Sequence, residues 1–436
     1  MADTDLVTVA VADPSGLLRG KAMPLRRYRE RPEAGIGWTP TNAFITCFGT
    51  IAAGPYGSFG DVRAIPDPDA TVAVERDDIG VVERFVLADV VVPEDGRPWE
   101  FCPRGHLRRA IERLAARGLS LTAAFEHEFL YAGTEPHPGL AFTLEARRRL
   151  GAFPDRLSAV LDAAGIAPEN ILPEYGAGQV EVSVAPKPAL RAADEAAILR
   201  ELVRATARGL GARASFVPIA DPAAVGNGVH VHFSLGDAAG RPQNFDPHEP
   251  HGIGRRAGAF LAGILAHLPG AIALAAPSVV SYLRLTPHRW SAAFTNLGAQ
   301  DREAAIRICP GFGPDEARPR QFHFEFRGAD ALASPHLALA ALIEAGIDGI
   351  ERDLPSPVPT VEDLAALPPD ALAARGIERL PTSLAAALDR LSASDRLRGA
   401  FGNAFVDGYL SLKRAEAAVV EGLDPAAAAA RYGEIY

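Results

Sequence analysis

The sequence predicts an α+β protein with two domains. Its 436 residues exceed what one hydrophobic core usually serves, so a second domain is expected. The first hundred residues contain apolar runs typical of strands, and strand-like and helix-like segments alternate beyond them. A proline-containing segment at 93–98 is the best candidate linker. We therefore expect an N-terminal domain over residues 1–98 and a larger α+β domain over residues 99–436.

Three segments of the N-terminal domain are expected to be strands. Residues 6–12 form an apolar run followed by Asp-Pro-Ser-Gly, which is typical of a turn. Residues 71–75 and 84–92 are rich in valine and predict two further strands. The stretch 38–69 is rich in glycine, proline and small residues, and it predicts a long loop.

In the larger domain, helical periodicity predicts helices at 103–118, 195–208 and 335–352. A long apolar stretch covers 257–283, but His267, Pro269 and Gly270 interrupt it. Alanine-rich sequence of this kind is more typical of a buried helix and loop than of a membrane span. We therefore expect no membrane partner.

The composition indicates a cytoplasmic protein that does not bind nucleic acid. The formal net charge is −10 and no basic run occurs, which argues against a nucleic-acid partner. The three cysteines have no metal-like spacing, and their odd number fits a reducing compartment. The acidic N-terminus lacks the basic-then-apolar pattern of a signal peptide.

Polar pairs spaced two residues apart interrupt three apolar segments. They are Glu126/Glu128, His230/His232 and Glu325/Arg327. Residues i and i+2 of a strand point to the same face, so each segment would direct two polar groups one way. Burying such groups is costly unless they are paired. Three such strands around one cavity predict an active site for divalent cations and a phosphorylated ligand.

A fourth segment, at 173–182, carries Glu174 and Glu181 on either side of a Gly-x-Gly-Gln turn. A hairpin would return both carboxylates to the same mouth, whereas a simple loop would leave two solvated glutamates. Together with the pairs above, the set comprises five carboxylates and one or two imidazoles, with no thiolate. Oxygen and nitrogen donors of this kind suit Mg²⁺ or Mn²⁺ better than structural zinc.

Four arginines accompany these acids: Arg284, Arg302, Arg307 and Arg327. Guanidinium groups bind carboxylate and phosphate oxygens in a bidentate manner. Taken singly, each could be a surface or ion-pair arginine; taken with a metal site, they indicate a clamp for ATP phosphates and an anionic substrate. The sequence has neither a Walker-type loop nor a kinase glycine loop.

These motifs, in this order, resemble the glutamine synthetase family. The matching stretches are Glu-His-Glu-Phe at 126–129, Glu-x₆-Glu at 174–181, Gly-Asn-Gly-Val-His-Val-His-x-Ser at 226–234, Tyr-x-Arg-Leu-x-Pro at 282–287, Asp-Arg-x₄-Arg-Ile at 301–308 and Glu-Phe-Arg at 325–327. The resemblance covers nearly the whole chain and is weakest before residue 100. It implies a small N-terminal β-grasp-like domain, followed by a catalytic domain with a curved antiparallel sheet flanked by helices.

The resemblance implies roles residue by residue. One cation would be held by Glu128, Glu174 and Glu181, and the second by Glu126, His230 and Glu325. Glutamate binding is implied for Gly226, Arg284, Arg327 and Glu128, and ATP binding for His232, Ser234, Arg302 and Arg307. Arg302 and Arg327 would also act in catalysis. A further basic residue of the family corresponds to either Arg318 or Arg320.

The family reaction is an ATP-dependent ligation. The γ-carboxylate of glutamate attacks the γ-phosphate of ATP, and an amine then displaces phosphate from the acyl phosphate. The resemblance also implies a homo-oligomer, a dodecamer of stacked hexameric rings in which the N-terminal domain completes the neighbour's site.

The departures from the family concern the ammonium site. The family has a flap glutamate six residues after the arginine of Tyr-x-Arg-Leu, and this chain has Trp290 there. The stretch 41–49, which corresponds to a family loop bearing an aspartate, contains no acid. Binding and deprotonating ammonium requires nearby negative charge, whereas an indole favours a roomier or cation–π amine pocket. Trp290 is therefore the expected amine-site residue of a γ-glutamylamide ligase acting on a polyamine, ethanolamine or an alkylamine.

Other interpretations remain open at this stage. In a true glutamine synthetase another acid, such as Glu303, would replace the missing glutamate. A non-catalytic relative and a phosphotransferase of the guanidino-kinase type are the remaining alternatives. Val225 stands where the family commonly has an asparagine near the amino acid, which leaves the identity of the acid substrate open.

Overall fold

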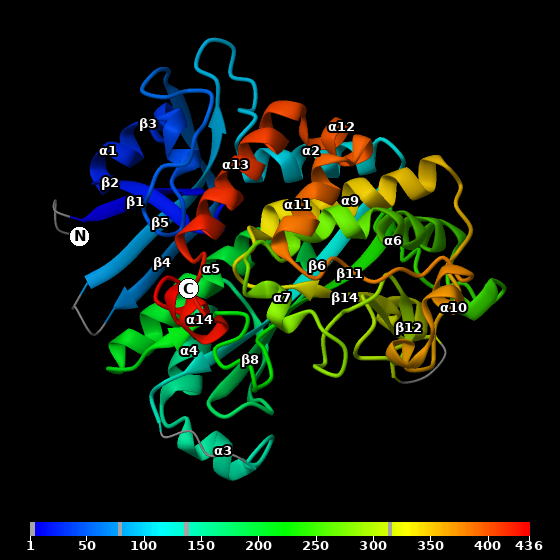
Figure 1. Ribbon diagram of the computed structural model, residues 1–436. Helices are drawn as coiled ribbons and strands as arrows, with labels where there is room; N and C mark the ends of the chain where they lie inside the picture. Colours follow the sequence, from blue (N-terminus) through cyan, green and yellow to red (C-terminus); the bar gives the residue numbers. More distant parts are fainter. Residues whose placement is uncertain (1–4, 77–80, 135–138, 313–315) are drawn as a thin grey trace.

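The structure is a computed structural model that describes residues 5–76, 81–134, 139–312 and 316–436. A small β-sheet lies in the N-terminal part, and a larger sheet with many helices forms the rest (Figure 1). The C-terminal helices return to the N-terminal part, where the Ser15 hydroxyl donates to the Glu416 carboxylate at 2.7 Å. The predicted α+β architecture, with a small N-terminal sheet domain and a larger domain, is confirmed.

The small sheet has the strand order β2-β1-β5-β4-β3. β1 pairs with β5 in parallel, and the other neighbours are antiparallel. Its elements are β1 Leu6–Ala12, β2 Leu18–Pro24, α1 Leu25–Glu30, β3 Ile36–Trp38, β4 Val62–Arg76 and β5 Val81–Val91. The strands predicted at 6–12, 71–75 and 84–92 are confirmed.

The long loop predicted at 38–69 is wrong over its last residues, because β4 already begins at Val62. Pro66 and Pro68 lie inside this strand, although proline cannot donate to a β-ladder. The pairing of β4 with β5 shifts register between Pro66 and Thr71. Such a bulge is one of the few places where a strand tolerates proline.

The large sheet has the order β12-β13-β14-β11-β6-β8-β7, with β9 and β10 also paired to β6. Its strands are β6 Leu119–Tyr131, β7 Pro168–Pro173, β8 Gln179–Val184, β9 Lys187–Pro188, β10 Ala214–Ser215, β11 Val229–Asp237, β12 Leu297–Ala299, β13 Ile306–Cys309 and β14 His323–Ala329. β12 and β13 are parallel and the other neighbours are antiparallel, so the expected antiparallel sheet is mixed at one edge.

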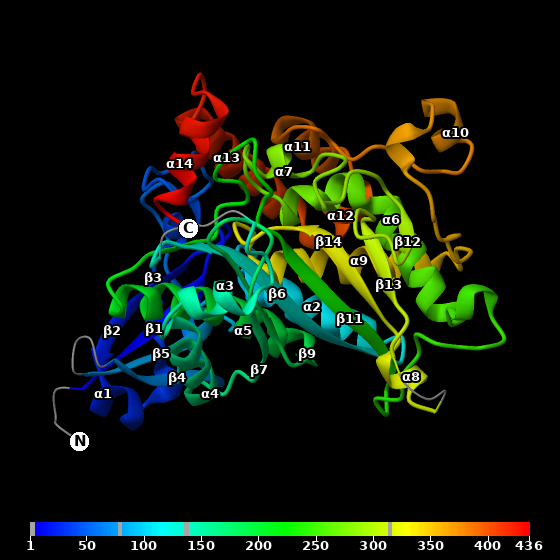
Figure 2. The same cartoon turned by 90° about the horizontal axis from the view of Figure 1, so that it is seen from below.

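Helices gather on one face of this sheet (Figures 1 and 2). The long helices α2 Pro103–Ala115, α5 Ala189–Gly209, α6 Arg255–Ala275 and α9 Pro335–Glu351 form this layer. The other helices described are α3 Leu144–Arg149, α4 Phe153–Ala163, α7 Ser281–Arg284, α8 Arg318–Gln321, α10 Pro369–Ala373, α11 Leu384–Ser392, α12 Asp395–Phe401, α13 Asn403–Val419 and α14 Pro425–Gly433. The predicted helices at 103–118, 195–208 and 335–352 correspond to α2, α5 and α9.

The apolar stretch at 257–283 forms α6, with Pro269 inside the helix. This helix is long and apolar enough to cross a membrane by length and composition alone, but 83% of its most apolar window is buried in the protein. The buried-helix interpretation is therefore confirmed.

Alternation along β6 separates the helix-covered face of the sheet from the open one. Phe125, His127 and Phe129 are buried, and β6 packs against α2 and α5. Glu126 and Glu128 point to the opposite face and are half-buried. The sheet thus supplies a rigid platform, and its open face carries the polar pairs.

A buried ion-pair network joins the two domains just after the predicted linker. Arg104 on α2 is 1% exposed and donates bidentately to Asp194 on α5, at 2.8 and 2.7 Å. The same guanidinium reaches Asp89 on β5 and Asp67 on β4, at 2.8 and 2.9 Å. The domain boundary after residue 98 stays a prediction, because buried contacts continue across it.

Replacing Arg104 by alanine is expected to lower the free energy of unfolding by about 3–5 kcal/mol, because three aspartates lose a buried partner. Arg108 binds two of the same aspartates but is 38% exposed, so Arg108→Ala is a matched control with an expected loss of about 0–1 kcal/mol. Denaturant unfolding of both variants checks this. Equal losses would contradict the central role of Arg104.

Candidate active site

Strand pairing brings the predicted acids and imidazoles together on the open face of the large sheet. Glu126 on β6 lies opposite His230 on β11, and Glu128 lies opposite Glu181 on β8. His230 Nδ1 and Glu126 Oε1 hydrogen bond at 2.7 Å. Ligand atoms of Glu126, Glu181 and His230 lie within 4.8 Å of one another. The pairs therefore meet as their spacing predicted.

The hairpin predicted at 173–182 is present as β7 and β8. The Glu174 amide donates to the Gln179 carbonyl at 2.9 Å, which closes the turn. The Gln179 side chain donates to Glu128 Oε2 at 3.4 Å and to the Gly226 carbonyl at 3.0 Å. The turn is thus fixed to β6 and to the loop before β11, and both Glu174 and Glu181 are half-buried at this edge.

Glu325 on β14 extends the cluster toward the other edge of the sheet. It is 1% exposed, and both Arg307 and Arg327 donate to its carboxylate. His230 Nδ1 lies 3.7 Å from Glu325 Oε1. Ligand atoms of Glu126, His232 and Glu325 also lie within 4.8 Å of one another. Ser234 follows His232 by two residues on β11, so it shares the same face.

Arg284 at the end of α7 is 2% exposed and forms part of the wall of the site. Its guanidinium donates to the carbonyls of Ala329 and Arg327, both at 3.1 Å. Gly226 and Gly228 lie against it, and a Cβ atom at Gly228 would come within 2.4 Å of Arg284 Nη2. Glycine is therefore required there by the close approach of the arginine.

The remaining arginines lie at different depths. Arg327 Nε donates to the Arg302 carbonyl at 2.7 Å, whereas the Arg302 side chain is exposed. Arg318 and Arg320 lie on the exposed α8, with the Arg318 guanidinium 5.8 Å from the centroid of the Phe245 ring. The structure brings Arg307 and Arg327 into the acid cluster and leaves open which residue of α8 meets phosphate.

Trp290 lies in the loop after α7 with 63% of its surface exposed and φ at 57°, an unusual conformation for a bulky residue. Hydrogen bonds to its backbone hold this loop. The amides of His288 and Trp290 donate to the two oxygens of Glu303, each at 2.9 Å. Arg327 Nη2 donates to the Trp290 carbonyl at 3.2 Å. Arg327 thus links the acid cluster to the tryptophan loop.

A cavity of about 690 Å³ opens beside Trp290. Trp290 and Phe294 line it together with four acids and one arginine: Asp301, Glu303, Glu362, Asp363 and Arg302. Asp363 lies 3.3 Å from His288, and Glu362 pairs with Arg375. The cavity combines an aromatic wall with an excess of negative charge.

Comparisons with known proteins agree with this geometry. The family model for the glutamine synthetase catalytic domain matches residues 100–425, and the model for the glutamine synthetase N-terminal domain matches residues 1–99. The chain belongs to the glutamine synthetase family. It is an ATP-dependent ligase, and ligases of this family use ATP and divalent metal ions.

Three relatives of this family member are informative. A gamma-glutamylpolyamine synthetase, GlnA3 of Streptomyces coelicolor, is 34% identical over 98% of this chain and 92% of its own length. A crystal structure of a novel glutamine synthase homolog is 40% identical, with a TM-score of 0.91 over 100% of this chain and 99% of its own. A GmaS/ADP complex is 26% identical, with a TM-score of 0.81 over 95% and 93%.

The donor set fits a hard divalent cation. The groups that meet on the open face are carboxylate oxygens and imidazole nitrogens, and the two clusters that share Glu126 each span less than 4.8 Å. Mg²⁺ and Mn²⁺ prefer such ligands. In this family member, Arg307 and Arg327 form ion pairs with Glu325 and so neutralise its buried negative charge.

The pKa values of two carboxyl groups in the cluster, Glu181 and Glu325, shift in opposite directions. Burial, reinforced by Glu126, Glu128 and Glu174, raises the pKa of Glu181 to about 9. Burial also opposes ionisation of Glu325, but His230, Arg327 and other cationic neighbours outweigh it and lower its pKa to about 2. One carboxyl therefore holds a proton at neutral pH until a cation replaces that proton.

Metal binding to the substrate-free enzyme is expected to release a proton and to tighten with rising pH. Because the pKa of Glu181 is raised to about 9, the protonated form dominates at pH 7 and must be lost on binding. Affinity should then rise about tenfold per pH unit below that pKa for a one-proton exchange. Titration calorimetry with Mn²⁺ in buffers of different ionisation enthalpy checks this. Glu181→Gln should abolish the proton release, and pH-independent affinity would contradict the account.

Two residues at the site escaped sequence reasoning, Cys309 and His323. His323 Nε2 lies 3.0 Å from His232 Nδ1, and Cys309 Sγ lies 3.8 Å from Glu325 Oε2. Burial opposes ionisation of the thiol, but His232 and His323 lower the pKa of Cys309 to about 7. Extending the alternation of each strand by two residues, from Glu325 to His323 and from Arg307 to Cys309, would have found both.

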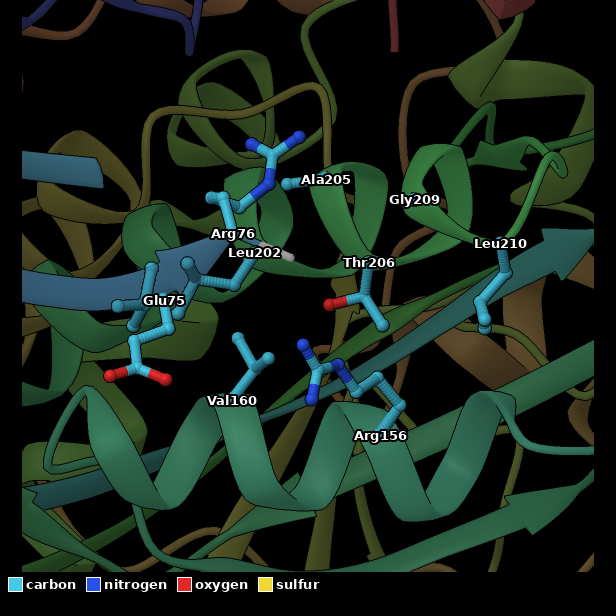
Figure 3. Close-up of a pocket in the computed structure, with 10 residues that line it drawn as sticks. Glu75, Arg76, Arg156, Val160, Leu202, Ala205, Thr206, Gly209 and Leu210 are labelled. Atoms are coloured by element: carbon cyan, nitrogen blue, oxygen red, sulfur yellow. The ribbon is translucent and has the colours of Figure 1, made fainter. Parts of the chain in front are cut away.

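A second cavity, of about 160 Å³, lies between β4, α4 and α5 (Figure 3). Arg156, Val160 and Thr206 lie on its walls (Figure 3). Among the residues that the structure describes there, none belongs to the predicted site. The predicted site residues lie instead on the open face of the large sheet.

Proposed function

We propose that this protein is a γ-glutamylamide ligase, which joins the γ-carboxylate of glutamate to an organic amine at the expense of ATP. The observation that carries the proposal is Trp290, which stands where the family has the flap glutamate and borders a large acidic cavity. A polyamine, ethanolamine or an alkylamine is the proposed amine class. The likeness to a gamma-glutamylpolyamine synthetase over nearly the whole chain supports this choice.

In this proposal the sheet residues hold two Mg²⁺ or Mn²⁺ ions. Glu128, Glu174 and Glu181 bind one ion, and Glu126, His230 and Glu325 bind the other. The bound cations would neutralise phosphate and carboxylate charge as the substrates approach each other. His232, Ser234, Arg302 and Arg307 bind ATP, whereas Gly226, Arg284, Arg327 and Glu128 bind glutamate.

The reaction proceeds in two substitutions. A γ-carboxylate oxygen forms a bond to the γ-phosphorus, and ADP leaves with the electrons of the broken P–O bond. The amine nitrogen then bonds to the acyl carbon, phosphate departs with the C–O electrons, and the nitrogen loses a proton. Arg327 and Arg302 act by holding charge, which fits a reaction that depends on positioning.

The cavity favours a cationic organic amine over ammonium. Trp290 can contact an alkylammonium group through its ring face, and the carboxylates of Asp301 and Glu303 attract its charge. Both Glu303 oxygens already accept backbone hydrogen bonds from the loop. Glu303 therefore serves better as a fixed negative charge than as a mobile base for ammonium.

Steady-state phosphate release and product mass test the proposal. The assay contains Mg-ATP, L-glutamate and a panel of ammonium, methylamine, ethanolamine, putrescine, spermidine and aniline. A γ-glutamylamide from an organic amine, with little glutamine, supports the proposal; efficient glutamine formation supports a true glutamine synthetase. Glutamate labelled with ¹⁸O in the γ-carboxylate should pass one label to phosphate. Unlabelled phosphate would contradict the acyl phosphate and favour a phosphotransferase.

The assembly belongs to the same proposal. We place the chain in the cytoplasm as a homo-oligomer, a dodecamer of two stacked hexameric rings. In such rings the N-terminal sheet borders the neighbour's site. Analytical ultracentrifugation of the active enzyme should show a single large species, and a fully active monomer would contradict the shared site.

A further inference from the structure

Three strands bring a cysteine and two histidines together at the edge of the acid cluster. His232 lies on β11, Cys309 on β13 and His323 on β14, with Cys309 directly opposite His323 in the β13–β14 pairing. One ligand atom from each residue lies within 4.8 Å of the others. Cys309 is 7% exposed, so the group is shielded but borders the site.

The contacts around the two imidazoles orient them for coordination. His323 Nδ1 must donate to the Gln321 carbonyl, at 2.7 Å, because a carbonyl only accepts. Nε2 of a neutral His323 then carries a lone pair, which accepts a hydrogen bond from His232 Nδ1 at 3.0 Å. On the other ring, His232 Nε2 lies 3.7 Å from Glu126 Oε2, so its Nδ1 is the atom turned to His323. A metal-ligating histidine usually donates its other ring N–H to a carbonyl or carboxylate, which fixes the orientation of the ring.

The distances suit a tetrahedral ion. Two nitrogen ligands of a tetrahedral zinc, with bonds of about 2.0 Å, are about 3.3 Å apart. His232 Nδ1 and His323 Nε2 are 3.0 Å apart, so a small outward movement of either ring would admit the ion. A thiolate with two imidazoles is a zinc-type donor set, whereas Mg²⁺ and Mn²⁺ prefer the oxygen-rich cluster beside it.

We propose that His232, Cys309 and His323 form a separate site for a thiophilic divalent cation such as zinc, with its fourth position left for a water molecule. On binding, the Cys309 proton is released to the solvent, and the proton between His232 Nδ1 and His323 Nε2 is displaced, so that His232 keeps a proton only on Nε2, which faces Glu126. Metal binding is independent of the proposed function, but one consequence rests on it. Since His232 is a proposed ATP contact, zinc at this site excludes the nucleotide and inhibits the ligase.

Cobalt(II) is the probe that tests the site, because a cobalt–thiolate bond gives a charge-transfer band that oxygen and nitrogen ligands lack. The full-length protein, saturated with Mg²⁺ and free of ATP, is titrated with Co²⁺. The wild type should show that band together with the strong visible absorption of tetrahedral cobalt. Cys309→Ser should lose the band, and His323→Gln should weaken Co²⁺ binding by about 10-fold or more.

Cys102→Ser is the matched control. Cys102 is buried and caps α2 by accepting from the Gly105 amide, a role that serine also fills. This variant should keep the full cobalt spectrum. An unchanged spectrum in Cys309→Ser, or weak octahedral absorption without a charge-transfer band in the wild type, would overturn the site.

Zinc inhibition provides the second readout. The zinc concentration that halves phosphate release should rise with ATP concentration, and in Cys309→Ser it should rise about 10-fold or more. Equal zinc sensitivity of wild type and Cys309→Ser would also overturn the proposal. If no amine supports turnover, the cobalt titration still decides the metal site, so the two proposals fail separately.

Discussion

Glu325→Ala is expected to reduce ATP-dependent turnover by about a thousandfold or more, which corresponds to roughly 4 kcal/mol of transition-state stabilisation. Glu325 lies between the acid cluster and the arginines of the site. Its carboxylate is 3.7 Å from His230 and accepts hydrogen bonds from Arg307 and Arg327. Its loss removes a proposed cation ligand. It also leaves Arg307 and Arg327 without the carboxylate that they share. Both guanidinium groups would then shift and bind the ATP phosphates in altered positions.

Phosphate release at saturating substrates measures this effect. Glu325→Gln keeps an acceptor for the arginines but loses the charge, and it should be nearly as inactive. Glu169→Ala on the exposed side of β7 is the control and should match the wild type. Thermal unfolding separates lost chemistry from lost structure. A folded Glu325→Ala enzyme with more than a tenth of wild-type activity would contradict the assigned role.

Trp290→Glu is expected to shift amine preference toward ammonium. Its exposed ring borders the acidic cavity, and the loop that carries it is held through backbone groups by Glu303 and Arg327. The loop should therefore keep its path when the side chain changes. A carboxylate at this position can bind and deprotonate ammonium, and general-base catalysis of that kind contributes about 10²–10⁴-fold.

The measurement is kcat/KM for ammonium and for the preferred organic amine in parallel. The ammonium value should rise by about tenfold or more, and the organic amine value should fall. Trp290→Phe keeps an aromatic wall and should retain the organic amine preference. Unchanged amine preference in Trp290→Glu would place Trp290 outside the amine pocket.

Much of this site could be predicted because strand geometry is periodic. Glu126/Glu128 and His230/His232 share a face whatever the rest of the fold does, since residues two apart in a strand point the same way. The Gly-x-Gly-Gln turn between Glu174 and Glu181 fitted either a hairpin or a simple loop, and the β7–β8 pairing shows the hairpin. Local sequence was therefore sufficient to place each pair on one face of its own strand, but it did not decide which strands are neighbours.

Features that depend on long-range register could not be predicted in this way. Pro66 and Pro68 argue against a strand locally, and only the shifted pairing with β5 accommodates them. The parallel pairing of β12 with β13 across a short connection likewise has no local signal in the sequence. Strand alternation places Cys309 and His323 each on the face of the site, but only the β13–β14 register brings the two residues together.

In the loop after α7, too, the sequence predicts a local feature but not a long-range contact. Its departure from the family at Trp290 is visible in the sequence, whereas the position of Glu303 beneath it is not. The structure places both oxygens of Glu303 on loop amides. An acid that sequence reasoning considered as a substitute base thus has a defined contact, and this contact decides how the amine site is interpreted.

A competition assay tests the central claim most directly. The enzyme receives Mg-ATP, L-glutamate, ¹⁵N-ammonium and one unlabelled organic amine at equal concentration, and the products are weighed by mass spectrometry. The account predicts a γ-glutamylamide that contains the organic amine and almost no ¹⁵N-glutamine. Predominant ¹⁵N-glutamine, with each amine of the panel in turn, would contradict it and identify the protein as a true glutamine synthetase.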